Sequence, residues 1–337
     1  MSRKILVTGA AGFVGAFLSE KLLEDGNEVY GIDNLNDYYD IDLKDERLKM
    51  LNSYDRFHFT KGDISDKETV MNLFEEVRPE IVINLAAQAG VRYSLENPDA
   101  YIASNMLGFY NILEACRHYP VEHLLYASSS SVYGENKKVP FAESDFVDNP
   151  VSLYAATKKS NELMAHTYSH LYDIPASGLR FFTVYGPLGR PDMAYFKFVD
   201  MFFNDEPIRI YNNGDFENDM YRDFTYIDDI VEGIEKLIDN PPVKTEEHAA
   251  HSVYNIGNNQ PEKLMTFITS LEKALSNSLN REIEFEKIYE PIKPGDVPAT
   301  YADTSKLQEA INFKPETTIQ DGLQKFTDWY VEYYDKK

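Results

Sequence analysis

Tyr154 and Lys158 are the two residues of this sequence whose types and spacing most directly suggest chemistry. They are four residues apart in a segment, Ser152 to Tyr172, that predicts a helix, so both side chains leave the same face one turn apart. A phenol has a pKa of about 10, and an ammonium group held beside it stabilises the phenolate and lowers that pKa. The pair is therefore a candidate general base. Because such pairs also occur by chance on amphipathic helices, its meaning depends on the elements that position it.

A run of serines, Ser128 to Ser131, precedes this helix in the sequence. It follows the apolar stretch Leu124 to Ala127, which predicts a strand, so we expect the serines at the carboxyl end of that strand. Ligands bind at the carboxyl ends of strands in open α/β sheets. The sequence therefore predicts hydroxyl groups where a substrate would bind.

The N-terminal segment predicts a dinucleotide site. Residues Lys4 to Val7 have the pattern of a buried strand, and Gly9, Gly12 and Gly15 follow at three-residue spacing. An apolar-periodic helix then runs to about Leu23. In such a strand, turn and helix, the glycines let backbone amides approach a pyrophosphate at the helix N-terminus.

Two carboxylates are expected at the adenosine end of this site. Asp33 ends a second predicted strand, Glu28 to Ile32, where it can accept hydrogen bonds from the ribose hydroxyls and would repel a 2′-phosphate. We therefore expect NAD as the cofactor in preference to NADP. Asp63 follows a third predicted strand, Phe57 to Lys61. It could reach the adenine or could serve only in a turn or helix cap, and the sequence leaves both alternatives open.

Length, charge and cysteine content limit the class of protein. The 337 residues suffice for two domains, and the 43% of apolar residues can fill their cores. A formal net charge of -23 argues against non-specific binding to nucleic acid or anionic membranes, since the dominant field repels phosphate. The start is too brief for a signal peptide, and no run approaches the roughly 18 apolar residues of a membrane span. Cys116 is the only cysteine, so we expect a core residue there and a cytoplasmic protein.

Strand and helix patterns alternate through the first half of the chain. A strand from Ile81 to Ala87 ends in small residues that would let a cofactor lie against the backbone. A helix from about Pro98 to Arg117 carries Asn105 at its polar centre. Alternation of this kind predicts an α/β fold with a parallel, doubly wound sheet, here over residues 1–183.

The second half of the chain has a different character. Residues 183–225 show an irregular pattern that contains Arg190 and Arg222. A regular pattern returns at residues 228–239, and helices are expected at about residues 264–275 and 319–334. Because a dense apolar pattern is missing, we predict a smaller C-terminal cap over residues 184–337, interleaved with the sheet to which some of its segments return.

Six motifs together resemble the extended short-chain dehydrogenase/reductase family: Thr8–Gly15, Asp33–Leu35, Leu85–Ala87, Ser128–Gly134, Tyr154 with Lys158, and Phe182–Pro187. Within that family, Ala87–Ser94 and Gly189–Ala194 resemble nucleotide-sugar 4-epimerases that act on UDP-glucuronate. The resemblance covers nearly the whole chain. It implies a Rossmann domain with bound NAD, a smaller cap that holds the UDP-sugar, and a homodimer that pairs the helices near residues 100–117 and 153–172.

The resemblance also implies roles for individual residues. Tyr154 would take the proton of the sugar 4-hydroxyl, Ser129 would hydrogen-bond the same oxygen, and Lys158 would hold the ribose and lower the pKa of Tyr154. NAD would accept the hydride of carbon 4 and return it on the other face of the sugar, staying bound through turnover. Implied cofactor contacts, besides Tyr154 and Lys158, are Gly9, Gly12, Phe13, Val14, Gly15, Asp33, Asn34, Asp63, Ile64, Leu85, Ala86, Ala87 and Asn105. Implied substrate contacts are Ser129, Ser130, Ser131, Thr183, Arg190, Arg222 and Asp296.

Three other functions remain open. A nucleotide-sugar dehydratase or decarboxylase would use the same tyrosine and lysine, but such enzymes of this family carry acidic residues where Ser130 and Ser131 stand. A UDP-glucose 4-epimerase differs less and is the main alternative. From another class, the chain could be a non-catalytic NAD sensor or scaffold, against which the intact set of Ser129, Tyr154 and Lys158 argues.

Two further patterns have structural as well as functional interpretations. His166 and His170 have a metal-like spacing on a helix, but no third ligand is evident, so we expect exposed helix positions and no metal site. Tyr38 and Tyr39 either form a loop over the adenosine or belong to a surface turn. The surface turn is slightly favoured.

Overall fold

The fold is built on a parallel seven-stranded sheet with helices on both faces. The computed structural model describes residues 2–212, 214–215, 219–291 and 299–337. The strand order is β10–β6–β5–β4–β1–β2–β3, and every neighbouring pair is parallel. The strands are β1 Lys4–Thr8, β2 Glu28–Asp33, β3 Phe57–Lys61, β4 Ile81–Asn84, β5 His123–Ser129, β6 Ala176–Phe181 and β10 His251–Ile256. The predicted doubly wound sheet is confirmed, and its order reverses between β1 and β4, where such sheets bind ligands.

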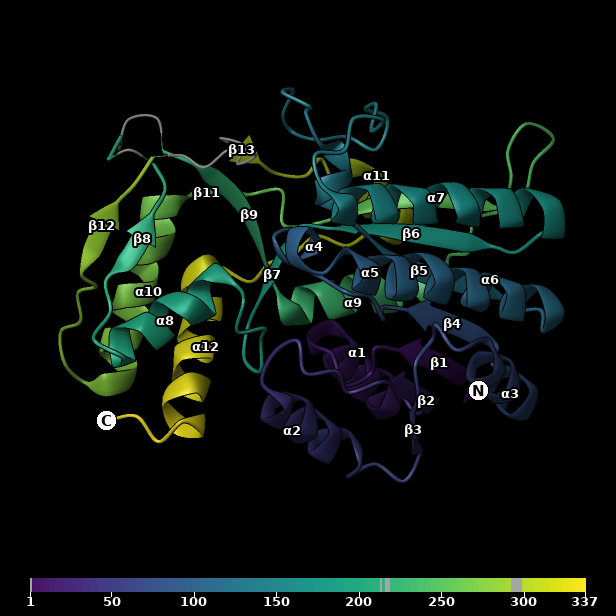
Figure 1. Cartoon of the computed structure of the whole chain (residues 1–337), viewed down its shortest axis with the longest axis horizontal. Coiled ribbons are helices and arrows are strands. Elements are labelled where there is room, and N and C mark those ends of the chain that lie inside the picture. The colour runs from purple at the N-terminus through teal and green to yellow at the C-terminus, as the bar shows by residue number, and fades with distance from the viewer. Residues whose placement is uncertain (1, 213, 216–218, 292–298) are drawn as a thin grey trace.

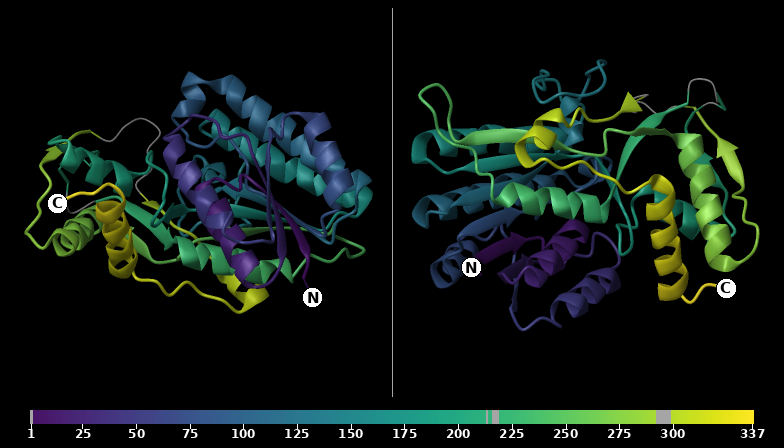
Figure 2. Two further views of the ribbon diagram at one scale, coloured as in Figure 1. Left: turned by 90° about the horizontal axis from the view of Figure 1, so that it is seen from below. Right: turned by 180° about the vertical axis from the view of Figure 1, so that it is seen from behind.

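Helices cover the two faces of this sheet and create two apolar layers (Figure 2). One layer packs α1 against α9, and the other packs α3, α6 and α7 together. Cys116 of α6 is buried in the second layer, as predicted. These helices are α1 Phe13–Glu24, α2 Ile41–Leu51, α3 Lys67–Val77, α4 Tyr93–Glu96, α5 Pro98–Tyr101, α6 Phe109–His118, α7 Leu153–Tyr172, α9 Ile227–Ile238 and α11 Ser305–Ile311.

The helix predicted from Pro98 to Arg117 is interrupted. It consists of α5, a π-helical segment from Ile102 to Gly108, and α6. The π-helical segment contains the buried Asn105, whose side chain bonds two other parts of the chain. Interruptions of this kind are common where a helix adapts to a functional site.

A second group of elements lies at one end of the sheet, at the left in Figure 1. Strand β9 is its centre and pairs with β7, β11 and β13, while β8 pairs with β12. The helices of this group are α8 Ala194–Phe203, α10 Leu264–Leu279 and α12 Ile319–Tyr333. The strands are β7 Thr183–Tyr185, β8 Ile208–Ile210, β9 Tyr221–Tyr226, β11 Pro261–Lys263, β12 Lys287–Tyr289 and β13 Ala299–Thr300.

The prediction of an irregular segment at residues 183–225 was wrong, because this segment contains β7, α8, β8 and most of β9. Helix α8 is not predicted by helix propensity, since most of its apolar residues are aromatic or β-branched, and these are weak helix formers. It forms because Tyr195 and Phe196 pack against Phe326 of α12. Burial of aromatic surface thus decides the structure here.

Among the described residues, no helix combines the length and apolar character that crossing a membrane requires.

Candidate active site

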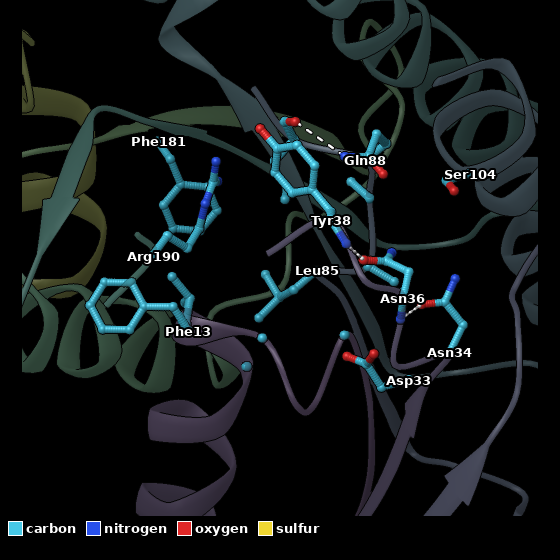
Figure 3. A pocket seen from close by; sticks show the side chains of 18 of the residues that line it. Phe13, Asp33, Asn34, Asn36, Tyr38, Leu85, Gln88, Ser104, Phe181 and Arg190 are labelled. Carbon is cyan, nitrogen blue, oxygen red and sulfur yellow. Dashed lines mark hydrogen bonds between the residues drawn. The ribbon is translucent and has the colours of Figure 1, made fainter. Parts of the chain in front are cut away.

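A cleft opens at the carboxyl ends of β1, β4 and β5 and continues toward β7 and α8 (Figure 3). It is lined by most of the residues predicted from the sequence. These are Gly9, Gly12, Phe13, Val14, Gly15, Asp33, Asn34, Asp63, Ile64, Leu85, Ala86, Ala87, Ser129, Tyr154, Lys158 and Arg190. Residues far apart in the chain therefore meet at the topological switch point of the sheet.

The glycine turn forms the floor of the cleft. Gly9 has φ +72°, and a Cβ there would lie 2.8 Å from the backbone nitrogen of Ala86. A Cβ at Gly15 would lie 2.1 Å from the carbonyl oxygen of Gly9. Side chains at these positions would push the turn away from β4 and α1, so the close approach of β1, β4 and the start of α1 requires glycine. The N-terminus of α1 faces the cleft through Phe13 and Val14, as a pyrophosphate site requires.

The adenosine end of the cleft is organised by carboxylates. The two oxygens of Asp33 accept hydrogen bonds from the backbone nitrogens of Ala11, at 3.2 Å, and Leu35, at 2.9 Å. The amide of Asn34 donates to Asp63 at 2.8 Å. Burial pushes the pKa of Asp63 upward, but hydrogen bonds from Asn34 and Ser65 outweigh it and lower that pKa. The arrangement fits an adenosine ribose, since ionised oxygens stand where ribose hydroxyls could donate.

Tyr38 and Tyr39 line the cleft, so the favoured surface turn was wrong. Tyr39 accepts a hydrogen bond from the guanidinium of Arg47 at 2.8 Å. The hydroxyl of Tyr38 lies 3.4 Å from Asp192, on the opposite wall, and its ring packs on Tyr93. A surface turn was favoured because only the tertiary fold brings residues 38 and 192 together.

Tyr154 and Lys158 lie at the start of α7, whose N-cap is Ser152. The Ser152 hydroxyl accepts a hydrogen bond from the backbone nitrogen of Ala155 at 3.1 Å, which fixes where the helix begins. Tyr154 hydrogen-bonds Ser129. Phenol, serine hydroxyl and ammonium therefore meet on one wall of the cleft, as predicted.

The expected effect of Lys158 on the Tyr154 phenol was wrong. Burial raises the pKa of Tyr154 above its ordinary value, and the hydrogen bond with Ser129 and the charge of Arg190 offset this only in part. The ammonium of Lys158 instead donates to the carbonyl of Ala127 at 2.9 Å, and burial lowers its own pKa to about 8. Sequence spacing placed the two groups on one helix face but carried no information about burial.

Of the other polar groups predicted to lie near the sugar, only Arg190 is among the described residues that line the cleft. The backbone N–H of Ser131 donates to the Ser129 hydroxyl oxygen at 3.1 Å, and this hydrogen bond closes the turn that follows β5. Ser130, Ser131 and Thr183 are not among the residues that line the cleft. Arg190 does line it, where it forms a two-pronged pair with Asp192, at 2.9 Å through Nε.

Three predicted contacts have other positions. Asn105 lies behind the cleft, where its amide binds the backbone of Gln88 and the hydroxyl of Thr157, so it joins β4 to α7 and does not line the cavity. Arg222 is the second residue of β9 and donates to the carbonyl of Tyr221 at 2.8 Å. Asp296 lies outside the described residues.

The described residues hold no group of three or more histidine, cysteine or acidic side chains that could bind a metal. His166 lies edge-on to His251, with ring centroids 5.4 Å apart. This contact belongs to the packing of α7 on β10.

Several lining residues carried no strong signal in the sequence. They are Asn36, Lys44, Ser104 and Phe181. Lys44 donates to the carbonyl of Asn36 at 2.7 Å, which ties α2 to the turn after β2. Other lining residues belong to the motifs that carried the family resemblance, namely Gln88, Ala89, Phe182, Val184 and Met193.

A family model described as GDP-mannose 4,6 dehydratase matches residues 6–326. The chain belongs to this family. Individual relatives are similar to this chain over nearly its whole length. The protein CapI of Staphylococcus aureus is 53% identical over 99% of this chain and 100% of that protein. A probable UDP-glucuronate 4-epimerase of Rhizobium meliloti is 44% identical over 98% of both chains.

Solved structures of family members share this fold. UDP-glucuronic acid 4-epimerase from Bacillus cereus, in complex with UDP-glucuronic acid and NAD, has a TM-score of 0.86 and 33% identity over 98% of this chain and 100% of that one. UDP-glucose 4-epimerase from Thermotoga maritima, with UDP-glucose, has a TM-score of 0.83 and 28% identity over 98% and 99%. The resemblance to short-chain dehydrogenase/reductase epimerases is confirmed.

Proposed function

We propose that this protein is an NAD-dependent UDP-glucuronate 4-epimerase that interconverts UDP-glucuronate and UDP-galacturonate through a transient 4-keto sugar. The observation that carries the proposal is that Tyr154, Ser129 and Lys158 share one cleft with the glycine turn and Asp33. UDP-glucuronate 4-epimerases among the relatives, at 44% and 46% identity, support this substrate. The NAD bound in the Bacillus cereus structure supports this cofactor.

The chain's own groups account for the proton transfers. Tyr154 removes the proton of the sugar 4-hydroxyl and later returns it, and the Ser129 hydroxyl hydrogen-bonds the same oxygen. Bound NAD supplies the acceptor and donor of a hydride. Burial raises the pKa of the Tyr154 phenol, which makes its phenolate a stronger base for the 4-hydroxyl proton and its neutral form a weaker acid. Lys158 closes the wall behind the phenol and would bind the ribose.

The substrate's polar groups have candidate partners outside this triad. We propose that Arg222 and Asp296 contribute to binding the nucleotide diphosphate part of the substrate. Asp296 lies outside the described residues. Arg190, Thr183 and the serines at 130 and 131 would surround the sugar carboxylate. Support comes from the cationic Arg190 on the cleft wall and from the turn that Ser129 caps.

Two competing functions are less well supported. Dehydration or decarboxylation needs an acid or base at sugar carbon 5, and serine occupies both positions where acidic residues were expected for that chemistry. UDP-glucose 4-epimerase remains the alternative substrate assignment, although the structural relative of that name is 28% identical, below the 33% of the UDP-glucuronic acid enzyme.

We further propose a cytoplasmic homodimer. Large apolar side chains are exposed on neighbouring helices of one face of the sheet, and a pairing of α4, the π-helical segment and α7 with a second copy would cover them. They are Leu95 (78% exposed), Ile102 (49%), Leu107 (47%), Leu163 (58%) and Leu171 (59%). Light scattering of the purified protein would measure twice the 38.7 kDa mass of one chain if this is correct.

The proposed reaction is tested by supplying UDP-glucuronate and UDP-glucose separately and identifying the product sugars by NMR. We expect UDP-galacturonate from the first, with no net release of NADH and much slower conversion of the second. Stoichiometric NADH would indicate a dehydrogenase, and a pentose product would indicate a decarboxylase. Absence of turnover with retained NAD would favour the sensor or scaffold.

A further inference from the structure

We infer that Glu162 and Arg180, which the reaction does not use directly, are positioning residues that hold one wall of the cleft against helix α7. This wall, called the Ser129 wall below, is the end of β5 with Ser129 and the short helix Ser130–Tyr133. This inference rests on the proposed function, since it concerns the groups that would react. Both side chains are buried, with 3% of their surface exposed. Nε of Arg180 donates to one carboxylate oxygen of Glu162 at 2.8 Å and Nη2 to the other at 2.9 Å.

A buried ion pair of this kind is an unusual choice for stability alone. Removing two charges from water costs several kcal/mol per ion, and well-packed apolar residues often stabilise a core as well or better. Arg180 lies on β6, next to the edge strand β10, and Glu162 lies on α7, one helical turn beyond Lys158. The two-pronged pairing fixes both distance and orientation, because a planar fork meets a planar carboxylate.

The carboxylate of Glu162 also reaches the strand that carries the reacting serine. The hydroxyl of Ser128 donates to it at 2.7 Å, and Ser128 is the immediate neighbour of Ser129 at the end of β5. One turn earlier on α7, Lys158 donates to the carbonyl of Ala127 at 2.9 Å. Two consecutive turns of α7 are thus fixed to two consecutive residues of β5. The separation between Tyr154 and Ser129 depends on these contacts.

The guanidinium of Arg180 extends the same network to the turn after β5. Its Nη1 donates to the hydroxyl of Tyr133 at 3.0 Å, and that hydroxyl donates to the side chain of Asn255 at 2.6 Å. Asn255 in turn donates to the carbonyl of Phe141 at 2.8 Å. Tyr133 ends the short helix that begins with Ser130. The network therefore holds the whole Ser129 wall, without a contact to the cleft from Glu162 or Arg180.

The consequence concerns rate more than binding. Proton and hydride transfer require reacting atoms near ~3 Å, and a displacement of ~1 Å caused by a remote change can cost about 10²-fold in rate. Most groups expected to bind NAD lie in the glycine turn and at or directly after the ends of β2, β3 and β4, and none of them hydrogen-bonds to Glu162 or Arg180. Loss of the ion pair should therefore lower kcat and leave bound NAD and KM nearly unchanged.

The test uses Glu162→Gln, Arg180→Lys and Tyr133→Phe in the full-length protein with its bound NAD. We expect kcat for UDP-glucuronate to fall by roughly 10- to 100-fold in the first two and by a smaller factor in Tyr133→Phe, with KM within about twofold. Tyr133→Phe keeps the buried ring and removes only its hydrogen bonds, so it should fold even if Glu162→Gln does not.

Ser177→Ala is the matched control. Ser177 lies on the same strand as Arg180 and makes a buried hydrogen bond to His123 of β5 at 2.8 Å, at the end of the strands remote from the cleft. It should lower the melting temperature and leave kcat unchanged. The inference is overturned if Tyr133→Phe and Arg180→Lys keep wild-type kcat, or if every variant, including the control, loses kcat in proportion to its melting temperature.

The wild-type protein in the same assay separates this inference from the proposed function. If the wild type does not epimerise UDP-glucuronate, the proposed function fails. If the wild type turns over and the variants do too, the positioning role alone fails.

Discussion

Replacing Tyr154 with phenylalanine is the most direct test of the proposed chemistry. The substitution removes one oxygen and keeps the ring, which packs edge-on against Tyr101 with centroids 6.0 Å apart. The start of the helix is unaffected, since its N-cap hydrogen bond is donated by the backbone nitrogen of Ala155 to the hydroxyl of Ser152. We therefore expect the fold and the bound NAD to remain.

The expected loss follows from what the hydroxyl does. It is the hydrogen-bond partner of Ser129, and without it no group of the triad can take the 4-hydroxyl proton. Loss of a general base costs ~10²- to 10⁴-fold in rate, or roughly 3 to 5 kcal/mol of transition-state stabilisation. The rate of sugar conversion is measured by NMR, and bound NAD is measured after denaturing the protein.

The pH dependence gives a second readout. Burial raises the pKa of Tyr154, so the phenolate fraction of the ligand-free protein increases with pH through the alkaline range. The wild-type rate should therefore rise with pH, and the variant should lose that rise. Tyr126→Phe is the control, because it removes another buried phenol, which bonds His251 at 2.8 Å outside the cleft. Retention of more than a tenth of the wild-type rate by Tyr154→Phe would refute the assignment.

The remaining predictions concern cofactor, substrate and acid stability. Asp33→Asn should lower the preference for NAD over NADP about fivefold or more, since a like charge near 4 Å costs about 1 to 4 kcal/mol; unchanged binding constants by calorimetry would contradict it. Thr183→Val should weaken turnover of UDP-glucuronate more than of UDP-glucose, and equal losses in steady-state kinetics would count against a carboxylate contact. Burial lowers the pKa of His123 and of His251 to about 4, so the unfolded chain binds more protons between pH 6.5 and 4 and stability is lost as pH falls through that range. His123→Gln should flatten that loss in urea unfolding, by roughly 3 kcal/mol at most.

Local patterns predicted the parts of the site that are formed by neighbours in the sequence. The glycine turn, the strand that ends at Asp33, and the pairing of Tyr154 with Lys158 each depend on residues within about one helix or strand. The structure brings all of them to one cleft. The parallel direction of the strands followed from alternation, because parallel strands need helical crossovers.

Contacts between distant segments could not be predicted in this way. The approach of Tyr38 to Asp192 and the pairing of Glu162 with Arg180 are set by tertiary packing. Sequence spacing does not predict such packing. The same applies to the pKa of Tyr154, which burial raises although the sequence suggested a decrease. The family resemblance implied a cofactor contact for Asn105, yet its side-chain amide hydrogen-bonds the backbone of Gln88.

The position of β10 has a consequence for fragments of this protein. This strand comes late in the chain, after β7, α8 and β9, and pairs with β6 over six residues at the edge of the sheet. A fragment that stops at residue 183 would lack both β10 and α9, leaving the edge of β6 that pairs with β10 without a partner and the side of α1 that packs on α9 uncovered. Exposed edges of this kind recruit other strands and promote aggregation. Autonomous expression of the N-terminal half is therefore a poor route to an isolated nucleotide-binding unit, and a circular permutant that keeps residues 227–256 attached would be the better design.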